Sequence, residues 1–505
     1  MKVRIIALCL AAATLLSLSS CSMGGIFTCS AGHADRGNDG ICDRCEKTVT
    51  ETVDFYVIND LHGKLLDTHS QPGVDELTTY LKLNGLSDER AVLLSTGDMW
   101  QGSSESSLTY GMMMTDWMNE LNFAAMTLGN HEFDWGEEYI EACDVAADFP
   151  FLAINVYDRF TGRRAEYCES STVVDLGNVQ IGIIGAIGDC YGDISSDKVE
   201  DVYFKVGGEL TELVKDESEK LRDKGADFVV YLLHDGYGRS SGTTDYVSPG
   251  KMSSYYDDEL SCGYVDLVFE GHTHQSYVLY DNYEVYHLQG GGENRAISHV
   301  EILINVANGK SKLQLAETVS SDVYSRLGDD PVIGELSEKY AEEIAKAQRV
   351  VGTNGEYRSG DELRALVAEL YLEAGIAEWG EEYNIALGGG YLSVRSPYNL
   401  YAGEVKYADL YSVFPFDNEI VLCSVSGYDL RRRFLEASNS DYFISLGEYG
   451  ESLGSNINSS ATYYVVVDSY TSQYAPNRLT VIDSLGAGIY ARDLLEEYIE
   501  KGGMK

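Results

Sequence analysis

Five short apolar runs in the first part of the chain constrain its fold more than any other feature. Each run is four to six residues long, is bounded by Gly, Asp, Asn or His, and several are separated by helix-like stretches. The runs occupy residues 55–58, 91–94, 179–184, 228–233 and 265–269. Such runs are typical of strands in substantially buried sheets, and the strand–helix–strand order indicates an α/β fold. Because α/β sheets bind ligands beyond the carboxyl ends of their strands, the polar residues there are the site candidates.

Polar patterns with histidine follow most of these runs. Five of the nine histidines fall within four patterns, and a fifth pattern, Gly97-Asp98, lacks histidine. The four patterns are Asp60-Leu61-His62-Gly63, Gly129-Asn130-His131-Glu132, His234-Asp235-Gly236 and Gly271-His272-Thr273-His274. A lone histidine at a strand end is usually a surface or capped residue. Five such patterns in one region indicate one shared site.

The residue types in these patterns suit a pair of metal ions. Two ions roughly 3.5–4 Å apart can hold both the attacking and the leaving oxygen of a phosphate ester. Such a pair needs a bridging carboxylate, neutral imidazoles and a further oxygen donor, and the patterns offer all three. Gly97 and Gly129 precede Asp98 and Asn130 and let the backbone bend sharply towards the ions. This donor set suits Zn, Mn, Fe or Co alike.

Taken together, the patterns resemble the signature set of the 5'-nucleotidase family of calcineurin-like metallophosphoesterases, in the family's order. The resemblance runs from about residue 54 to the C-terminus. It implies a four-layer α/β/β/α metallophosphoesterase sandwich, followed by a smaller α/β C-terminal domain that binds substrate. It further implies that Asp98 bridges two divalent ions. The remaining implied ligands are Asp60, His62 and His274 for one ion and Asn130, His234 and His272 for the other.

The resemblance also implies the catalytic roles. His131 would stabilise charge on the phosphate or protonate the leaving oxygen, and Asp134 would orient its ring. For Asp134 the alternative is a helix N-cap. The nucleophile would be a metal-bound water, because coordination lowers its pKa towards neutrality.

The implied activity is removal of phosphate from nucleotides, of the 5'-nucleotidase type. Two enzyme alternatives use the same metals: a 2',3'-cyclic-nucleotide 2'-phosphodiesterase with 3'-nucleotidase activity, and a nucleotide-sugar hydrolase. A non-enzyme alternative is a surface binding protein that retained the fold. Departures from the family's pattern at Leu387 and at residues 474–476 leave the nucleoside preference open.

In this family the C-terminal domain binds the nucleoside. Residues 388–390 and Arg395 resemble its glycine-rich turn ending in arginine, and Phe416 and Asn418 resemble its Pro-Phe-x-Asn motif. The implied contacts are base stacking on Phe416, a hydrogen bond to Asn418 and an anionic group at Arg395. Tyr470 corresponds to the family's second stacking aromatic. From composition alone, a core aromatic is the favoured role of Phe416, and the motif context is what supports base stacking.

The N-terminal residues are typical of an export signal. Lys2 and Arg4 precede an apolar run at residues 5–18, and the following Ser-Ser-Cys21 resembles a bacterial lipobox. We therefore expect a signal peptide over residues 1–20 and a lipidated Cys21. The protein would then be anchored to the outer face of a bacterial cell membrane. An ordinary cleaved signal with an incidental cysteine is the alternative.

Residues 21–50 combine the expected anchor with a small unit rich in Cys, His and Asp. A Cys-x-x-Cys pair at Cys42 and Cys45, with Cys29 and His33 upstream, suits a tetrahedral zinc ion. The same segment has acidic residues near calcium-loop spacing. That alternative uses Asp35, Asp39, Gly40, Asp43 and Glu46. Zinc, calcium and a plain disulfide stay open for residues 29–46.

The charge balance limits the partners. Lys and Arg total 37 against 81 Asp and Glu, a formal net charge of −44. A surface this negative repels polyanions, so we expect no nucleic acid polymer as a stable partner. A nucleotide or related phosphate ester remains suitable because metal ions supply positive charge locally. The rest of the chain is expected to form a catalytic domain at 51–325, a linker helix at 326–351 and a C-terminal domain at 352–505.

Overall fold

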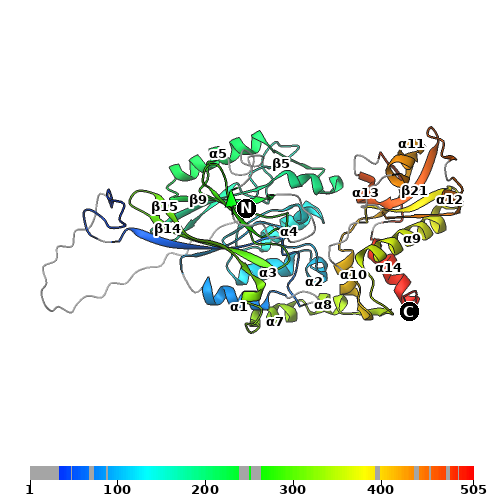
Figure 1. Cartoon of the computed structure of the whole chain (residues 1–505), viewed down its shortest axis with the longest axis horizontal. Helices are drawn as coiled ribbons and strands as arrows, with labels where there is room; N and C mark the ends of the chain where they lie inside the picture. Colours follow the sequence, from blue (N-terminus) through cyan, green and yellow to red (C-terminus); the bar gives the residue numbers. More distant parts are fainter. Residues whose placement is uncertain are drawn as a thin grey trace.

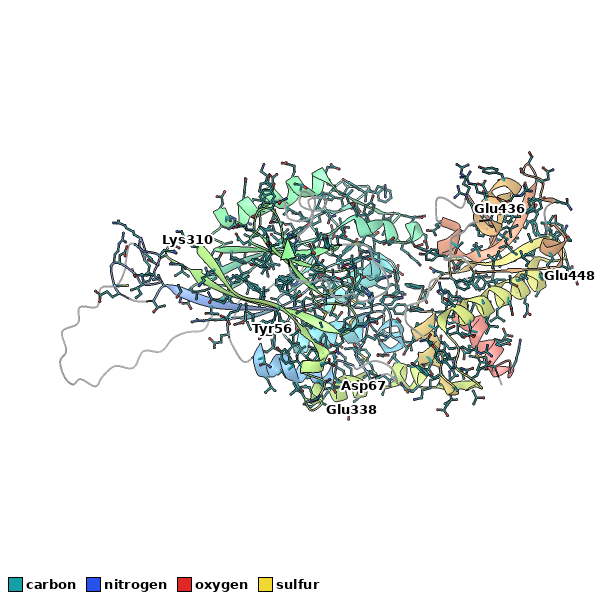
Figure 2. The ribbon with its side chains drawn as sticks, viewed as in Figure 1. Tyr56, Asp67, Lys310, Glu338, Glu436 and Glu448 are labelled. Atoms are coloured by element: carbon teal, nitrogen blue, oxygen red, sulfur yellow. The ribbon has the colours of Figure 1, made fainter. Side chains whose placement is uncertain are left out.

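The computed structural model describes residues 33–46, 48–67, 73–86, 89–237, 250–251, 263–392, 399–436, 443–453, 456–473, 478–486 and 488–504. It is elongated, with Lys310 towards one end and Glu448 at the other (Figure 2). The first part of the chain forms the larger body and the last part a smaller one (Figure 1). Among the described helices, none has the length and apolar character needed to cross a bilayer.

Two sheets form the larger body. In spatial order, the first sheet contains β15 (Lys310–Ser320), β14 (Ala296–Asn305), β1 (Thr50–Ile58), β2 (Ala91–Ser95), β3 (Ala125–Thr127) and β4 (Phe151–Leu152). The second contains β10 (Gly250–Lys251), β12 (Tyr277–Tyr280), β13 (Tyr286–Gln289), β11 (Leu267–Glu270), β9 (Phe228–His234), β7 (Gln180–Ile187) and β6 (Ser171–Asp175). Strands β1 to β4 run parallel, as do β7, β9, β11 and β13. Their carboxyl ends therefore gather at one edge of each sheet.

The central strands of both sheets are buried on both faces. Phe55 of β1 and Phe228 of β9 lie between the sheets, with ring centroids 6.2 Å apart. The next residues along these strands, Tyr56 and Val229, belong to the outer hydrophobic clusters. This alternation follows from the two-residue period of a strand. It explains why the sequence shows continuous apolar runs there.

Helices cover the outer face of each sheet and complete the predicted four layers. The first sheet packs on α1 (Asp75–Asn84), α3 (Met112–Glu120) and α4 (Glu137–Ala146), and the second on α5 (Gly208–Asp223). The other helices of this part are short. They are α2 (Ser104–Leu108), η1 (Asn130–Phe133), η2 (Asp189–Asp193), η3 (Ser196–Lys198) and η4 (Ser321–Val323). A separate strand pair joins β5 (Val156–Asp158) to β8 (Val202–Phe204).

The predicted linker helix over 326–351 is two helices, α7 (Pro331–Lys339) and α8 (Ala341–Ala347). The break falls at Tyr340, whose φ of −107° and ψ of 31° are not helical. The Tyr340 hydroxyl and the Lys339 amine both bond to the Asp116 carboxylate, which holds the chain at this bend. Asp330 caps the start of α7 by accepting a hydrogen bond from Val332 N.

The smaller body is built on one mixed sheet. In spatial order its strands are β20 (Phe443–Leu446), β17 (Ile385–Gly390), β21 (Thr462–Asp468), β19 (Ile420–Ser426) and β22 (Thr480–Ser484). Its helices are α9 (Gly360–Trp379), α10 (Tyr407–Val413), α11 (Gly427–Asp429), η5 (Leu430–Leu435), α12 (Glu448–Leu453), α13 (Ser469–Gln473) and α14 (Ala491–Glu500). The antiparallel pair of β16 (Val350–Asn354) and β18 (Gly403–Lys406) lies beside it. Helices α9 and α14 pack on one face of the sheet and η5 on the other, so its core is separate from that of the larger body.

Candidate active site

The parallel strands bring the predicted ligands together. Asp60 and His62 follow β1, Asp98 follows β2, and Asn130 opens η1 after β3. His234 ends β9, and His272 and His274 follow β11. The ligand atoms of Asp60, His62 and His274 lie within 4.8 Å of one another, as do those of Asp60, Asp98 and His234. Asp60 is common to these two groups, and the bridging position predicted for Asp98 stays a prediction.

Backbone strain is concentrated at these residues. Left-handed φ values between 50° and 67° occur at Asp60, His62, Asp98, His272 and His274. Residues with a Cβ rarely adopt this conformation, and each instance costs of order 1–3 kcal/mol. The surrounding fold therefore forces the side chains inward at five of the seven predicted ligands.

The buried Glu132 carboxylate holds two of these loops in place. It accepts hydrogen bonds from the backbone N–H groups of Asp98 and Met99, both at 2.8 Å, and of Gly129 at 2.7 Å. Burial and the nearby Asp98 carboxylate raise the pKa of Glu132 to about 7. The sequence reasoning gave this residue no role. A usable signal was present, because a Glu three residues after Gly129 has capping-box spacing.

The first ligand group brings two imidazole nitrogens and a carboxylate together. His62 Nδ1 donates to the Gln101 carbonyl at 2.9 Å, which leaves His62 Nε2 as an acceptor. That nitrogen lies 3.0 Å from His274 Nε2. The Asp60 carboxylate is 3.4 Å from the same His274 nitrogen and accepts the His272 N–H at 2.9 Å.

The second group gathers around His234. Its Nδ1 donates to the Thr96 carbonyl at 2.6 Å, and its Nε2 lies 3.2 Å from both Asp98 Oδ2 and Asn130 Oδ1. His272 Nδ1 is 3.0 Å from the same Asn130 oxygen. Burial works against a charged ring, yet Asp98 and Asp60 raise the pKa of His234 to about 10. Burial also opposes charge on Asp98, but His234 and His131 hold its pKa well below the usual range.

These observations fit divalent metal ions. Imidazole lone pairs, two carboxylates and an amide oxygen converge, which is a donor set for first-row divalent metals. The raised pKa of His234 shows that the carboxylates draw positive charge into the cluster. A divalent ion would meet the same electrostatic demand and release the proton.

His131 and Asp134 form a pair beside these groups. His131 Nδ1 lies 2.8 Å from Asp134 Oδ2, and each side chain is 21% exposed. The backbone N–H of His131 donates to Asp98 Oδ1 at 2.8 Å, which ties the pair to the ligand cluster. Asp134 follows η1, and Gly136 occupies the N-cap position of α4. The structure therefore favours the predicted contact with His131 over the N-cap alternative.

Sequence reasoning missed two residues on η2. Cys190 shares a group with His234 and His272, with ligand atoms within 4.8 Å, and its thiol donates to the His234 carbonyl at 2.9 Å. Asp193 Oδ2 lies 3.4 Å from His272 Nε2. A signal was available, since Gly188 and Cys190 directly follow the apolar run that forms β7, as the other patterns follow theirs.

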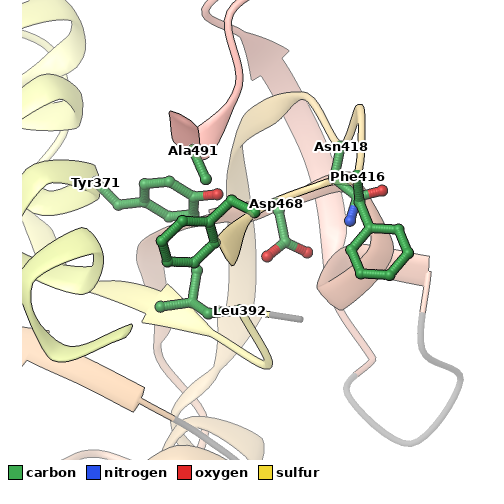
Figure 3. A pocket seen from close by; sticks show the side chains of 7 residues that line it. Tyr371, Leu392, Phe416, Asn418, Asp468 and Ala491 are labelled. Carbon is green, nitrogen blue, oxygen red and sulfur yellow. The ribbon is translucent and has the colours of Figure 1, made fainter. Parts of the chain in front are cut away.

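The nucleoside-side residues are arranged more loosely. The ring centroid of Phe416 lies 5.7 Å from that of His131, and the carbonyl of Pro415 accepts a hydrogen bond from Gln101 Nε2 at 3.1 Å. Phe416 and Asn418 extend from one loop and line a small pocket (Figure 3). Tyr470 on α13 packs against the Tyr391 ring, with centroids 5.9 Å apart. Arg395 lies outside the described residues.

The predicted glycine-rich turn at 388–390 is the end of strand β17. A Cβ on Gly388 would lie 2.3 Å from Leu372 N in α9, and one on Gly389 would lie 2.1 Å from the Phe443 carbonyl in β20. The glycines are therefore needed for close packing of strand against helix and strand. Local sequence shows only flexibility here, and the packing depends on distant elements.

Residues 53–276 match the calcineurin-like phosphoesterase family, and residues 343–449 match the 5'-nucleotidase C-terminal domain. The chain belongs to the 5'-nucleotidase family. It is 24% identical over 458 residues to Protein UshA of Yersinia enterocolitica, across 80% of this chain and 79% of that protein. It is 24% identical over 435 residues to a 5'-nucleotidase of Vibrio vulnificus, across 74% and 73% of the two chains.

A solved structure shares the fold of this 5'-nucleotidase family member. The putative 5'-nucleotidase from Staphylococcus aureus has a TM-score of 0.67 at 16% identity, covering 89% of this chain and 96% of that one. The predicted α/β sandwich with a C-terminal α/β domain is thereby confirmed. Family membership also establishes the reaction class, hydrolysis of a phosphoric ester.

Proposed function

We propose that this protein is an exported, dinuclear metal-dependent phosphohydrolase of the 5'-nucleotidase type, which removes phosphate from nucleotides. The observation that carries the proposal is that His131 lies beside the two ligand groups, with its ring centroid 5.4 Å from that of His62 and 5.7 Å from that of Phe416 in the smaller body. Phosphate chemistry and a surface for a base thus lie side by side.

Two divalent ions would be held by the residues that converge after β1, β2, β3, β9 and β11. These are Asp60, His62, Asp98, Asn130, His234, His272 and His274. When bound, the ions supply positive charge to the phosphate oxygens and acidify the attacking water. The donor set does not choose among Zn, Mn, Fe and Co. Glu132 acts through the backbone of Asp98 and is a positioning residue.

His131 carries the proton. Its Nδ1 is engaged by Asp134, which fixes the ring, and Nε2 would be the nitrogen that reaches the phosphate or the leaving oxygen. Asp134 also stabilises the protonated ring, because the carboxylate lies 2.8 Å from the nitrogen. Donation of the Nε2 proton lets the nucleoside leave as a neutral alcohol.

The substrate would lie where the two bodies meet. Phe416 offers a stacking face and Asn418 a hydrogen-bonding amide within the same pocket lining, and Tyr470 supplies a second aromatic. We propose the division into a catalytic domain at 51–325, a linker at 326–351 and a substrate domain at 352–505. The signal peptide over 1–20, the lipidated Cys21 and the nucleoside-side Arg395 belong to the proposal too, and all three lie outside the described residues.

Phosphate release by the purified mature chain tests this proposal. The chain is assayed with added Mn, Zn or Co on AMP, 3'-AMP, 2',3'-cyclic AMP, UDP-glucose and an aryl phosphodiester. We expect metal-dependent release from AMP and a loss of about 10²–10⁴-fold in His131→Ala. His299→Ala is the matched control, because His299 lies on β14 and contacts Asp54 and Glu317 instead.

The alternatives give different results in the same assay. Turnover of only 2',3'-cyclic AMP and 3'-AMP would indicate a cyclic-nucleotide phosphodiesterase with 3'-nucleotidase activity. Turnover of only UDP-glucose would indicate a nucleotide-sugar hydrolase. Absence of turnover on every substrate, with both metals bound, would overturn the nucleotidase proposal. It would leave the binding-protein alternative.

A further inference from the structure

A second cluster of metal-ligand side chains lies at the start of the described chain, away from the active site. His33, Cys42 and Cys45 place one ligand atom each within 4.8 Å of the others. Figure 1 shows this dark blue segment at the end of the larger body opposite the C-terminal part. Neither matched family region includes residues 33–46, so the phosphoesterase reaction gives this cluster no role.

The spacing of the ligand atoms fits tetrahedral zinc. With Zn–S near 2.3 Å and Zn–N near 2.0–2.1 Å, a tetrahedral ion sets neighbouring sulfur and nitrogen ligands about 3.5–3.6 Å apart. Cys45 Sγ and His33 Nδ1 are 3.5 Å apart. Both Cys42 and Cys45 are free thiols in the structure. The Cys-x-x-Cys spacing is the usual one for two zinc ligands from a single turn.

The backbone around Cys42 supports a thiolate. Ala34 N–H points at the sulfur from 3.5 Å, and the Glu46 N–H donates to the Cys42 carbonyl at 2.8 Å, which closes the turn. Zinc binds the deprotonated sulfur.

The acidic residues of the segment accept hydrogen bonds from the protein itself, which disfavours calcium binding. The Asp35 carboxylate accepts hydrogen bonds from Gly40 N at 2.9 Å, Asp39 N at 3.2 Å and Asn305 Nδ2 at 2.6 Å. Asp43 Oδ2 accepts from a backbone N–H in the same loop at 3.0 Å. These carboxylates shape the loop, and none of the metal-ligand groups in the described chain includes them.

The same loop is docked on the catalytic sheet. Asn305 at the end of β14 bonds to the Asp35 carboxylate, and Asn308 bonds to the Asp35 carbonyl at 3.3 Å and to Asn38 at 3.1 Å. The Val306 N–H donates to the Val49 carbonyl at 2.9 Å. A metal that closes the loop would therefore fix the chain just before β1 onto the β14–β15 turn.

We propose that His33, Cys42 and Cys45 form a structural zinc site that clasps the N-terminal loop to the β14–β15 hairpin. The described residues supply three ligands. Cys29 lies four residues upstream of His33, outside the described residues. The site is independent of the proposed nucleotidase activity, since it shares no residue with the active site.

Metal content of the mature chain tests the proposal. The wild type, a Cys42→Ala/Cys45→Ala double variant and a Cys423→Ala control are purified with zinc and a non-thiol reductant, then analysed by mass spectrometry for bound metal. Cys423 is a buried thiol on β19, far in sequence from the loop, and so controls for loss of a cysteine. We expect the double variant to hold about one zinc less per chain than the other two.

Cobalt substitution gives a second readout. A thiolate-to-cobalt charge-transfer band should weaken in the double variant and remain in the Cys423→Ala control. Turnover of an aryl phosphate reports whether the catalytic domain has folded and should be unchanged in both. If the double variant does not fold, His33→Gln tests the same ligand set with a smaller change. Equal zinc content in all variants, or a Cys42–Cys45 disulfide in the unreduced chain, would overturn the proposal.

Discussion

The residues predicted to hold the metals and the residues predicted to contact the nucleoside are held by different means. Asp60, Asp98 and His234 are at most 1% exposed, and hydrogen bonds to backbone groups fix each of them. Phe416 and Tyr470 are half-buried, and their side chains pack against other rings, while the Phe416 carbonyl accepts a hydrogen bond from Arg492 at 3.2 Å. Charge stabilisation depends steeply on position, so it needs a preorganised frame. Stacking tolerates small shifts, so a looser frame is sufficient.

The largest effect should follow from removing the Asp98 carboxylate, which lies at the centre of the predicted metal-ligand group. Asp98→Asn removes a charge that faces His234 Nε2 at 3.2 Å and lies next to the His131 backbone. We expect kcat/KM to fall by at least about 10⁴-fold, with loss of bound metal. Metal analysis and steady-state kinetics measure both effects. Asp134→Asn is the control, since it should reduce turnover while both metals remain. Full activity in Asp98→Asn would contradict the assigned ligand set.

A buried histidine and two carboxylates, close to the loop that carries His272 and His274, should contribute strongly to the stability of the larger body. His287 on β13 lies 2.6 Å from Glu270 and 3.7 Å from Asp281, with all three side chains fully buried. Burial opposes protonation, but the two carboxylates raise the pKa of His287 to about 9. His287→Gln leaves both carboxylates without a cation. We expect the free energy of unfolding to fall by about 3–5 kcal/mol.

The same three residues predict how the stability of the protein changes with pH. The His287 pKa is higher in the folded chain than the ordinary value of about 6.5. Its contribution to stability is therefore complete below about pH 6.5 and is lost as the pH rises through about 9. Thermal unfolding between pH 6.5 and pH 10 should show a larger loss of Tm for wild type than for His287→Gln. Parallel pH curves would show that this histidine is neutral in the folded protein.

On the looser side, Phe416→Ala should weaken binding of the base alone. Stacking of one base on an aromatic ring contributes about 1–3 kcal/mol by alanine substitution, so KM for AMP should rise about 5- to 150-fold. KM for a small aryl phosphate should change little, and kcat should stay close to wild type. Phe160→Ala is the matched control, because that ring is 80% exposed. An equal rise in KM for both substrates would place Phe416 outside base recognition.

The comparison also explains what the sequence could predict. Each predicted metal ligand lies within a few residues of an apolar run, and the family resemblance of those local patterns named all seven, whose role as ligands stays a prediction. His131 and Asp134 are three residues apart, so their contact is also local in the sequence. Glu132 and Cys190 act through backbone groups brought in by other strands, and the pattern did not identify their roles.

The smaller body shows the opposite case. The glycines at 388–390 predict a turn locally, but α9 and β20 approach β17 so closely that only glycine fits in an extended strand. The helix expected over 326–351 places Ile333 and Leu336 in the core, yet it breaks where the Tyr340 hydroxyl bonds to Asp116. Both outcomes depend on elements distant in the sequence.

The smallest expected effect is at the exposed contact between the two bodies, which tests whether the looser side is also mobile. Gln473 on α13 accepts hydrogen bonds from Ser195 Oγ and from Ser196 N, both at 2.9 Å, and donates to Asp197 at 2.9 Å. Such exposed polar bonds contribute about 1 kcal/mol or less, because water replaces them at low cost. Gln473→Ala should therefore change KM for AMP by less than about 5-fold and leave Tm unchanged within a degree or two.

The informative readout for Gln473→Ala is the relative position of the two bodies, measured by small-angle scattering with and without a nucleotide. If this contact biases closure, the variant without ligand should have a larger radius of gyration than wild type, and the two should agree once nucleotide is bound. Ser472→Ala is the control, because its hydroxyl bonds within α13 to the Ser469 carbonyl. Identical scattering for variant and wild type would mean that the exposed Gln473 contact does not bias closure. The hydrogen bond from Gln101 to Pro415, next to the active site, would then hold the two bodies together. The side chains of Phe416 and Tyr470 would then adapt to the substrate, while the position of the smaller body relative to the larger one would be as fixed as the metal site.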